Sequence, residues 1–317
     1  MKESLKRYSF KAMGSLCELQ ILHSSRIEAD AILSQMAAEV HRLENKYSRF
    51  NDSSFLSEIN RANGNKRGIE IDQETEALFD HALSCYEHSD GLFDVTAGIL
   101  NTLWNFKEIT VPEQSQVDQL LPYIGFHKLS WENSRLFLPA NMQLDLGGIV
   151  KEYAADSTAR LARDLGVKGG LVNLGGDFAV IGPQPGNRSW AVGITSPKDN
   201  TPLMARIDML EGGLASSGDY ERFFVHKGKR YSHILNPKTG WPCRGLRAVS
   251  VAASLTTIAG SFATIAMLME ERAAKQFLLE SSLAHVFMDS QGYIDGTEFM
   301  SVSQKNSIVN PARGSLE

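Results

Sequence analysis

Apolar residues recur every three or four positions in three segments of the first half of the chain, which predicts three amphipathic helices. The first begins near Glu28, the second covers 73–88 and stops at Asp90-Gly91, and the third covers 149–165 and stops at Gly166. Each helix is expected to bury one face. The residues predicted on these faces are Ile32, Met36, Val40, Leu43 and Tyr47, then Leu78, Ala82, Cys85 and Tyr86, and then Val150, Tyr153, Ala154, Ser157, Leu161 and Leu165.

The segments around these helices are predicted to be strands and loops. Residues 8–23 contain "CELQILH", a first strand after a turn at Gly14. Residues 50–65 are expected to form a polar loop with one short apolar turn, and 107–130 a loop with a short helix. The stretch "RLFLPANMQLDLGG", 135–148, predicts two short strands joined by a Pro-Ala-Asn turn.

The second half alternates short apolar segments with turns, which predicts a series of short strands. Two helices are expected at 257–270 and 271–281. The pattern indicates an α+β fold, a single compact domain over 1–317 with mixed or antiparallel sheets, packed helices and one or two lobes. Its core is expected at about 8–302, followed by a polar tail at 303–317. The expected strands are "LVNL", "FAVIG", "WAVGIT", "MARIDM", "RYSHIL", "AVSVAA" and "AHVFM".

Composition and charge exclude several classes of protein. Hydrophobic residues make up 43% and charged residues 22% of the 317, as in ordinary globular proteins. The formal net charge is -5 and no long block of like charge occurs, so no nucleic-acid partner is expected. The first residues lack an apolar signal core, and no apolar run reaches the ~20 residues that span a bilayer. We therefore expect no membrane span and a cytoplasmic location for the chain as given; a leader removed earlier, from a periplasmic or lipoprotein form, would leave no trace.

Two Gly-Gly pairs stand beside acids, in "LDLGGIVKEY" and "LVNLGGDFAVIG". Glycines just before a helix let backbone N–H groups approach a phosphate, and Lys151 in the first turn can neutralise a phosphate oxygen. Asp145 would repel phosphate, so it suits a metal, a ribose hydroxyl or a ring N–H instead. The alternative is a plain strand-to-helix turn with a surface lysine. The pattern matches neither the P-loop nor the dinucleotide fingerprint.

One histidine and several aromatic residues are further candidates. His233, in "RYSHILNPKTGWPC", is predicted on a strand, where it either accepts a proton or packs in the core. Phe50, Phe93 and Trp104 are predicted in loops, where they either stack on a flat ligand or belong to the core. From spacing alone, the sequence indicates a phosphate-bearing ligand and nothing more specific.

Taken in order, the motifs resemble the FAD:protein FMN transferases, the ApbE-type flavin transferases, from Met13 to about Met269. The motifs are "AMGS", "YSRFNDSSFLSEIN", "GLFDVTAGILNTLWNF", "LDLGGIVKEYAAD", "LVNLGGDFAVIG", "LASSGDYERFF" and "YSHILNPKTGWP". The resemblance implies an ApbE-like domain and a Mg²⁺-dependent enzyme. Such an enzyme cleaves FAD, links FMN through a phosphoester bond to Thr or Ser of an acceptor redox protein, and releases AMP. No acceptor-like Ser/Thr-Gly-Ala-Thr stretch occurs in the chain, so transfer is expected in trans.

The resemblance also implies roles for individual residues. The backbone carbonyl of Gly148 and the side chain of Thr264 correspond to magnesium ligands. His233 is our candidate base for the acceptor hydroxyl. The positions that match FAD-contacting residues are Met13, Phe50, Leu92, Phe93, Asp94, Asp145, Lys151 and Ile234.

One departure from the family pattern concerns the metal. Gly260 stands where the family has a magnesium-binding aspartate, four residues before Thr264. Mg²⁺ favours charged oxygen ligands, so the change is not conservative. Three interpretations remain open for Gly260: a working transferase in which Asp145, or water and FAD phosphates, hold the metal; a degenerate FAD-binding carrier or regulator; or an engineered or selected change that traps a ligand-bound state. An interaction protein on the same scaffold is a separate possibility. Aspartate restored at position 260 is expected to raise the magnesium affinity.

Overall fold

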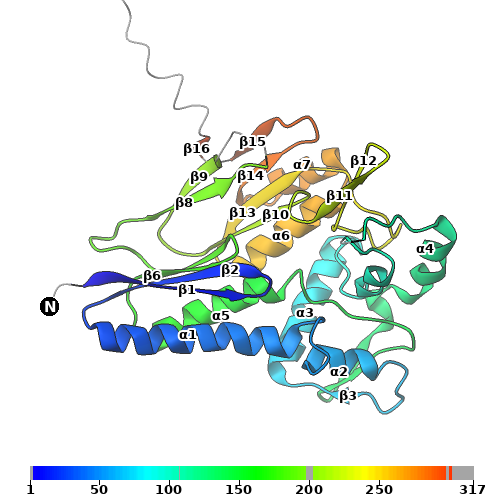
Figure 1. Ribbon diagram of the computed structural model, residues 1–317, viewed down its shortest axis with the longest axis horizontal. Helices are drawn as coiled ribbons and strands as arrows, with labels where there is room; N and C mark the ends of the chain where they lie inside the picture. The colour runs from blue at the N-terminus through cyan, green and yellow to red at the C-terminus, as the bar shows by residue number, and fades with distance from the viewer. Residues whose placement is uncertain (1–2, 107, 198–202, 298–299, 302–317) are drawn as a thin grey trace, which may run out of the picture.

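An eight-stranded antiparallel sheet forms the centre of the computed structural model, which describes residues 3–106, 108–197, 203–297 and 300–301. The strand order is β1-β2-β6-β7-β10-β13-β14-β15 (Figure 1). The strands are β1 Ser4–Ala12, β2 Ser15–His23, β6 Gly170–Leu174, β7 Asp177–Gly182, β10 Gly213–Gly218, β13 Ala248–Ala253, β14 Ala284–Met288 and β15 Ile294–Thr297.

Helices cover one face of this sheet and a small second sheet covers the other. α1 Arg26–Tyr47 and α5 Val150–Asp164 lie side by side against β1, β2, β6 and β7, while α6 Thr256–Leu268 packs on β10 and β13 (Figure 1). α7 Glu271–Glu280 packs on α6. On the opposite face, Trp190, Val192 and Met204 pack against Leu171, Val180 and Leu214 of the large sheet. They belong to β8 Trp190–Thr195 and β9 Leu203–Met209, which pair with β16 Met300–Ser301.

The remaining elements lie in two insertions. Between α1 and α5 come α2 Phe55–Arg61, α3 Gln73–His88, α4 Gln114–Leu120, three short 3₁₀ helices and a three-stranded sheet. Between β10 and β13 comes a hairpin of β11 Phe223–His226 and β12 Lys229–Ser232. The 3₁₀ helices are η1 Gly98–Thr102, η2 Leu121–Tyr123 and η3 Phe126–Lys128; the sheet is β3 Ile69–Glu70, β5 Arg135–Phe137 and β4 Ser130–Glu132.

The predicted α+β fold class is confirmed, and so are the helices with clear periodicity. α1, α3, α5, α6 and α7 lie where they were expected, and α5 ends before Gly166, whose φ of 88° is one that glycine adopts easily. The single-domain assignment stays a prediction. The tail predicted at 303–317 lies outside the described residues.

Three predictions of local structure are wrong. Residues 50–65 contain the helix α2, because the Ser54 side chain caps the Ser57 N–H. Residues 141–144 form no strand; Gln143 makes only an isolated bridge to Ala97. "RYSHIL" leaves its strand after Ser232. The strand β1 was also missed in part, because most of its residues are exposed at the edge of the sheet and alternate poorly.

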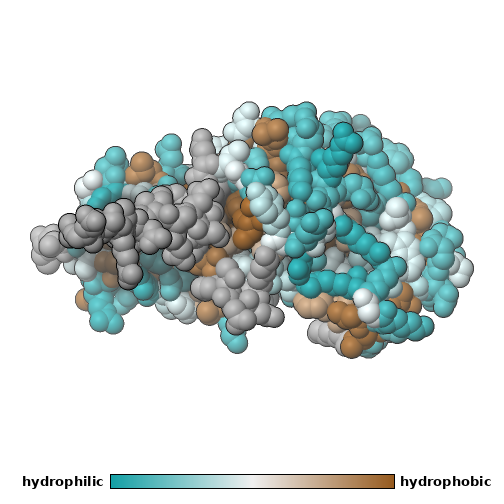
Figure 2. Space-filling model, turned by 90° about the horizontal axis from the view of Figure 1, so that it is seen from above, coloured by the Kyte–Doolittle hydropathy of each residue, from teal (hydrophilic) through white to brown (hydrophobic). Residues whose placement is uncertain are grey.

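In the part of the chain that the structure describes, every helix is too short or too polar to cross a membrane. On the face shown in Figure 2, hydrophilic residues predominate and hydrophobic ones gather only in small separate groups. The cytoplasmic location stays a prediction.

A charged network joins α1 to α3 at the edge of the main core. Arg42 Nη2 lies 2.6 Å from Glu74 Oε1, and Lys46 Nζ lies 2.7 Å from Glu74 Oε2 and also pairs with Asp72. The hydrogen bond from Arg42 lowers the pKa of Glu74 to about 2; burial opposes this change, and Lys46 adds to it. The Glu74 side chain is 20% exposed, but those of Arg42 and Asp72 are 46% and 56% exposed, so solvent screens part of this network.

We expect Glu74→Gln to lower the free energy of unfolding by about 1–3 kcal/mol at pH 7. The folded pKa lies below the unfolded one, so this stabilisation is fully present above about pH 4.5 and is lost as the pH falls toward 2. Chemical denaturation should therefore show a difference in the free energy of unfolding between the wild type and Glu74→Gln that is constant from pH 6 to 8 and disappears in acid. Glu76→Gln, on the same helix and without an ion pair to the described residues, is the control. A stability difference between the wild type and Glu74→Gln that stays the same at all pH values would contradict the prediction.

Candidate functional site

The turn before α5 is tied to two other segments by Asp145. Its Oδ1 accepts a hydrogen bond from the Gly147 N–H at 2.8 Å, and its Oδ2 accepts one from Asn101 at 3.2 Å. The Nε of Arg49 lies 3.1 Å from the same Oδ2. Asp145 thus joins the end of α1 and the 3₁₀ helix η1 to the Gly-Gly turn. The sequence did not single out Arg49 or Asn101.

Phe50 presents an aromatic ring at this junction. Its side chain is 77% exposed, and the Arg49 guanidinium lies 4.3 Å from the ring centroid. A ring with such a large open surface can stack on a flat ligand. The predicted loop position of Phe50 is confirmed, and its exposure excludes the alternative that it belongs to the core. Its contact with FAD stays a prediction.

In the predicted Leu92–Asp94 wall, Phe93 lies beside the Gly-Gly turn that precedes α5. The buried Phe93 ring would lie 3.5 Å from a Cβ added at Gly148, so the two residues are in contact range. Asp94 instead accepts hydrogen bonds from Thr96 and from the Phe126 N–H at 3.0 Å. Burial raises the pKa of Asp94, and these hydrogen bonds oppose that change. Its carboxylate shapes its own loop, while Leu92 packs on the main core.

Two further predicted FAD residues lie apart from Asp145. Met13, with φ of 51°, lies in the turn between β1 and β2, where its N–H donates to Glu44 of α1. Ile234 is half-buried, packs against the cores on both sides of α6, and accepts a hydrogen bond from the Cys243 N–H at 2.8 Å. No hydrogen bond or ion pair within the described residues joins either of them to Asp145.

The second Gly-Gly pair meets the first through an ion pair. Lys151 Nζ lies 2.7 Å from Asp177 Oδ2, and Asp177 is 1% exposed. The other oxygen of Asp177 accepts a hydrogen bond from the Ser216 N–H at 3.0 Å. Gly175 and Gly176 have φ of 65° and 99°, which lets the chain reverse directly before Asp177. Lys151 is therefore not a surface lysine, and Asp177 is a site residue that sequence reasoning missed.

A carboxylate occupies the space beside Gly260. Glu152 is 7% exposed, and its Cγ lies 2.5 Å from where a Cβ at Gly260 would stand. Its Oε2 has no hydrogen-bond partner among the described residues. Burial raises the pKa of Glu152, the nearby Asp177 adds to this effect, and Lys151 opposes it. This place therefore holds a carboxylate from α5, although position 260 itself is a glycine.

The two predicted metal residues flank the same place. Thr264 lies one turn after Gly260 on α6 and so on the same face, and Gly148 lies in the turn just before α5, four residues before Glu152. Within the described part of the chain, the Thr264 hydroxyl makes no hydrogen bond, and no backbone N–H bonds the Gly148 carbonyl. That part also holds no group of three or more His, Cys, Asp or Glu side chains suited to a metal. A cation here would therefore need mixed ligands: one carboxylate, a carbonyl and a hydroxyl.

His233 lies just after β12, not on it. The backbone N–H of His233 donates to the Arg222 carbonyl at 3.0 Å, and the ring Nδ1 lies 3.2 Å from the same oxygen. Because a carbonyl only accepts, that contact places the imidazole proton on Nδ1 and leaves Nε2 with a lone pair. Burial lowers the pKa of His233 to about 4, and the positive charges of Arg222 and Lys151 add to the shift. The imidazole is therefore neutral near pH 7.

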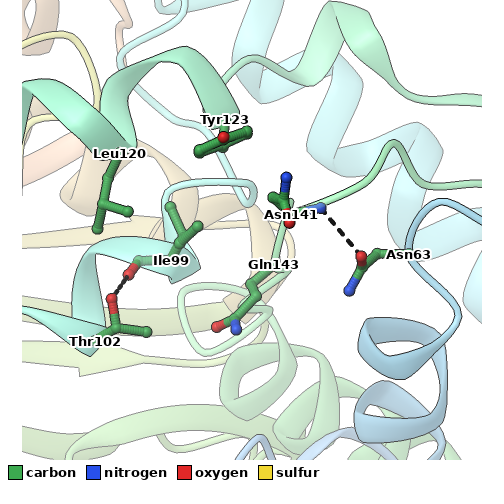
Figure 3. Close-up of a pocket in the computed structure, with 7 residues that line it drawn as sticks. All are labelled: Asn63, Ile99, Thr102, Leu120, Tyr123, Asn141 and Gln143. Carbon is green, nitrogen blue, oxygen red and sulfur yellow. Dashed lines mark hydrogen bonds between the residues drawn. The ribbon is translucent and has the colours of Figure 1, made fainter.

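A separate cavity of about 410 Å³ lies beside η1 (Figure 3). In Figure 3, the Asn141 backbone N–H donates to the Asn63 side chain, and the Thr102 hydroxyl donates to the Ile99 carbonyl. None of the predicted site residues lines this cavity, so it is not part of the site described above. Its lining residues are Asn63, Ile99, Thr102, Leu120, Tyr123, Asn141 and Gln143.

Comparisons with known proteins agree on one family. The model of the ApbE family matches residues 13–287. The FAD:protein FMN transferase of Treponema pallidum (strain Nichols) is 30% identical over 274 residues, which are 80% of this chain and 75% of that protein. The FAD:protein FMN transferase of Escherichia coli (strain K12) is 27% identical over 287 residues, 87% of this chain and 78% of that protein.

Solved structures share the fold. The ApbE protein of Thermotoga maritima has a TM-score of 0.85 and 28% identity, and the match covers 96% of this chain and 99% of that one. The flavin transferase ApbE of Vibrio cholerae has a TM-score of 0.83 over the same shares, but at 21% identity it supports the fold alone.

Proposed function

This chain belongs to the ApbE family and is a transferase, and on that premise we propose that it is a Mg²⁺-dependent FAD:protein FMN transferase. The hydroxyl of a Thr or Ser on an acceptor redox protein attacks the FMN-side phosphorus of FAD. The bond from that phosphorus to the oxygen bridging to AMP breaks, AMP leaves, and the hydroxyl proton passes to a base. Such a reaction depends on positioning and charge neutralisation rather than on a covalent enzyme intermediate.

The FAD side of the proposal rests on the junction around Asp145. The exposed Phe50 ring suits stacking on the flavin or the adenine, and Phe93 beside Gly148 suits a second wall. Lys151 has three N–H donors, of which Asp177 engages one, so the others are free to bind a phosphate oxygen. Met13, Leu92, Asp94 and Ile234 complete the proposed binding set.

The proposed proton acceptor is His233. A neutral imidazole with its proton on Nδ1 offers Nε2 to the acceptor hydroxyl. The Arg222 carbonyl that holds Nδ1 also fixes the ring orientation. This arrangement is the one a general base requires.

The proposed metal residues are Gly148, through its carbonyl, and Thr264, through its hydroxyl. Oxygen ligands with free lone pairs suit Mg²⁺, which also retains water. When bound, the ion would neutralise charge on the diphosphate of FAD. One observation favours an active transferase rather than a flavin carrier or regulator: the carboxylate of Glu152 lies beside Gly260.

The test is an intact-mass assay with FAD, Mg²⁺ and an acceptor domain that carries a Thr/Ser flavinylation site. We expect the acceptor to gain one FMN for each AMP released. If the protein binds FAD but transfers nothing at high Mg²⁺, the chain is instead a flavin-binding carrier or regulator.

A further inference from the structure

Glu152 is a buried carboxylate without a counterpart. It lies on α5 and is 7% exposed, and Oε2 finds no partner among the described residues. A buried charge normally survives only when it is paired or bound to a cation. The nearest cation, Lys151, is engaged 2.7 Å from Asp177. The Glu152 carboxylate is therefore suited to bind a cation that is not part of the described residues.

The oxygens around Glu152 share one chemical character. Thr264 lies one turn after Gly260 on α6, and Gly148 lies four residues before Glu152, in the turn that precedes α5. Neither the Thr264 hydroxyl nor the Gly148 carbonyl has a hydrogen bond within the described residues. A carboxylate, a carbonyl and a hydroxyl are oxygen ligands that a hard divalent cation prefers. Nitrogen and sulfur ligands are absent from this described group, which disfavours zinc.

Gly260 makes this arrangement possible. Glu152 Cγ stands 2.5 Å from the ideal Cβ position at 260, and its carboxyl carbon 2.9 Å from it, so any side chain there would displace Glu152. Glycine at 260 and glutamate at 152 therefore fit together as a pair. The carboxylate at this place comes from α5 instead of α6.

We propose that Glu152 is a ligand of the divalent cation, together with Gly148 and Thr264, and replaces the carboxylate that position 260 does not provide. The identification of the ion as Mg²⁺ rests on the proposed function. Waters and the phosphates of FAD would complete the coordination.

The test measures metal binding directly, by electron paramagnetic resonance of Mn²⁺ titrated into the whole protein with and without FAD, and by competition with Mg²⁺. Glu152→Gln should weaken Mn²⁺ binding by roughly 10–100-fold or more. Loss of a residue that only hydrogen-bonds to a metal ligand already weakens metal affinity by this factor, and loss of a ligand itself should cost at least as much. Asp164→Asn, an exposed acid on the same helix, is the matched control and should bind as the wild type does. Unchanged Mn²⁺ binding by Glu152→Gln, or no binding by the wild type in either condition, would overturn the proposal.

A swap variant protects the test against misfolding. Gly260→Asp alone should not raise the affinity, in contrast to the expectation from sequence, because Glu152 occupies the space. Glu152→Gly combined with Gly260→Asp should return the affinity toward that of the wild type. If the double variant folds, as judged by thermal melting, but still fails to bind Mn²⁺, the proposal is wrong.

The two proposals fail differently. If the wild type binds Mn²⁺ through Glu152 yet transfers no FMN, the transferase function is wrong and the ligand assignment stands. If FMN transfer depends on Mg²⁺ but Glu152→Gln leaves metal affinity unchanged, the ligand assignment is wrong and the function stands.

Discussion

Replacing His233 with alanine is expected to slow FMN transfer by about 10²–10⁴-fold, the usual contribution of a general base. The structure prepares this role, because the Arg222 carbonyl holds Nδ1 and burial keeps the imidazole neutral. Single-turnover release of AMP in the presence of an acceptor would measure the effect. His226→Ala, on the neighbouring strand β11, is the control and should leave the rate nearly unchanged.

The pH dependence of the same reaction gives a second readout. A base whose pKa is lowered to about 4 is unprotonated above that value, so the His233 contribution should be level from pH 5 to 8 and fall only near pH 4. A wild-type rate that halves near pH 6.5 would instead indicate a base with an ordinary histidine pKa. A His233→Ala enzyme with the wild-type rate would remove the residue from the mechanism altogether.

Replacing Lys151 with methionine is expected to lower the free energy of unfolding by about 3–5 kcal/mol, the cost of breaking a buried ion pair on one side. Asp177 is 1% exposed and would be left charged without its 2.7 Å partner. Thermal or urea unfolding measures the change. Lys168→Met, an exposed lysine just beyond α5, should change stability by less than about 0.5 kcal/mol.

The double variant Lys151→Met with Asp177→Leu isolates the pair. Removal of both charges leaves no uncompensated carboxylate, so much of the lost stability should return. If the losses of stability in the two single variants simply add in the double variant, Lys151 and Asp177 do not stabilise each other. The interpretation that this ion pair joins the two Gly-Gly segments is then wrong.

The sequence predicted the helices well because their periodicity reports directly on burial. α1, α3 and α5 each bury one face, and the sequence repeats that face every turn. Elements without such a period depend instead on a side-chain cap or on a position at the edge of a sheet. The Ser54 cap of α2 and the exposed edge strand β1 carry no apolar period, and both were missed in whole or in part.

The site was predictable residue by residue but not in its pairing. Asp145, Lys151 and His233 stand out locally, whereas the Lys151–Asp177 pair joins residues that only the folded sheet brings together. One signal was available for Glu152. It falls on a stripe with Ala155, Ala159 and Ala162, all buried, and an acid on an apolar helical stripe is unusual enough to mark a functional position.

The contact between Glu152 and Gly260 affects how relatives of this chain should be compared. The two positions cannot both carry full side chains in this geometry, so a carboxylate at one requires a small residue at the other. A comparison of position 260 alone would show a glycine and no acid in this chain. The same volume is nevertheless occupied by an acid, Glu152 of the neighbouring helix α5. If Glu152 binds the cation as proposed, relatives of this chain should be compared by whether a carboxylate fills this volume, from either helix, and not by the residue at position 260 alone.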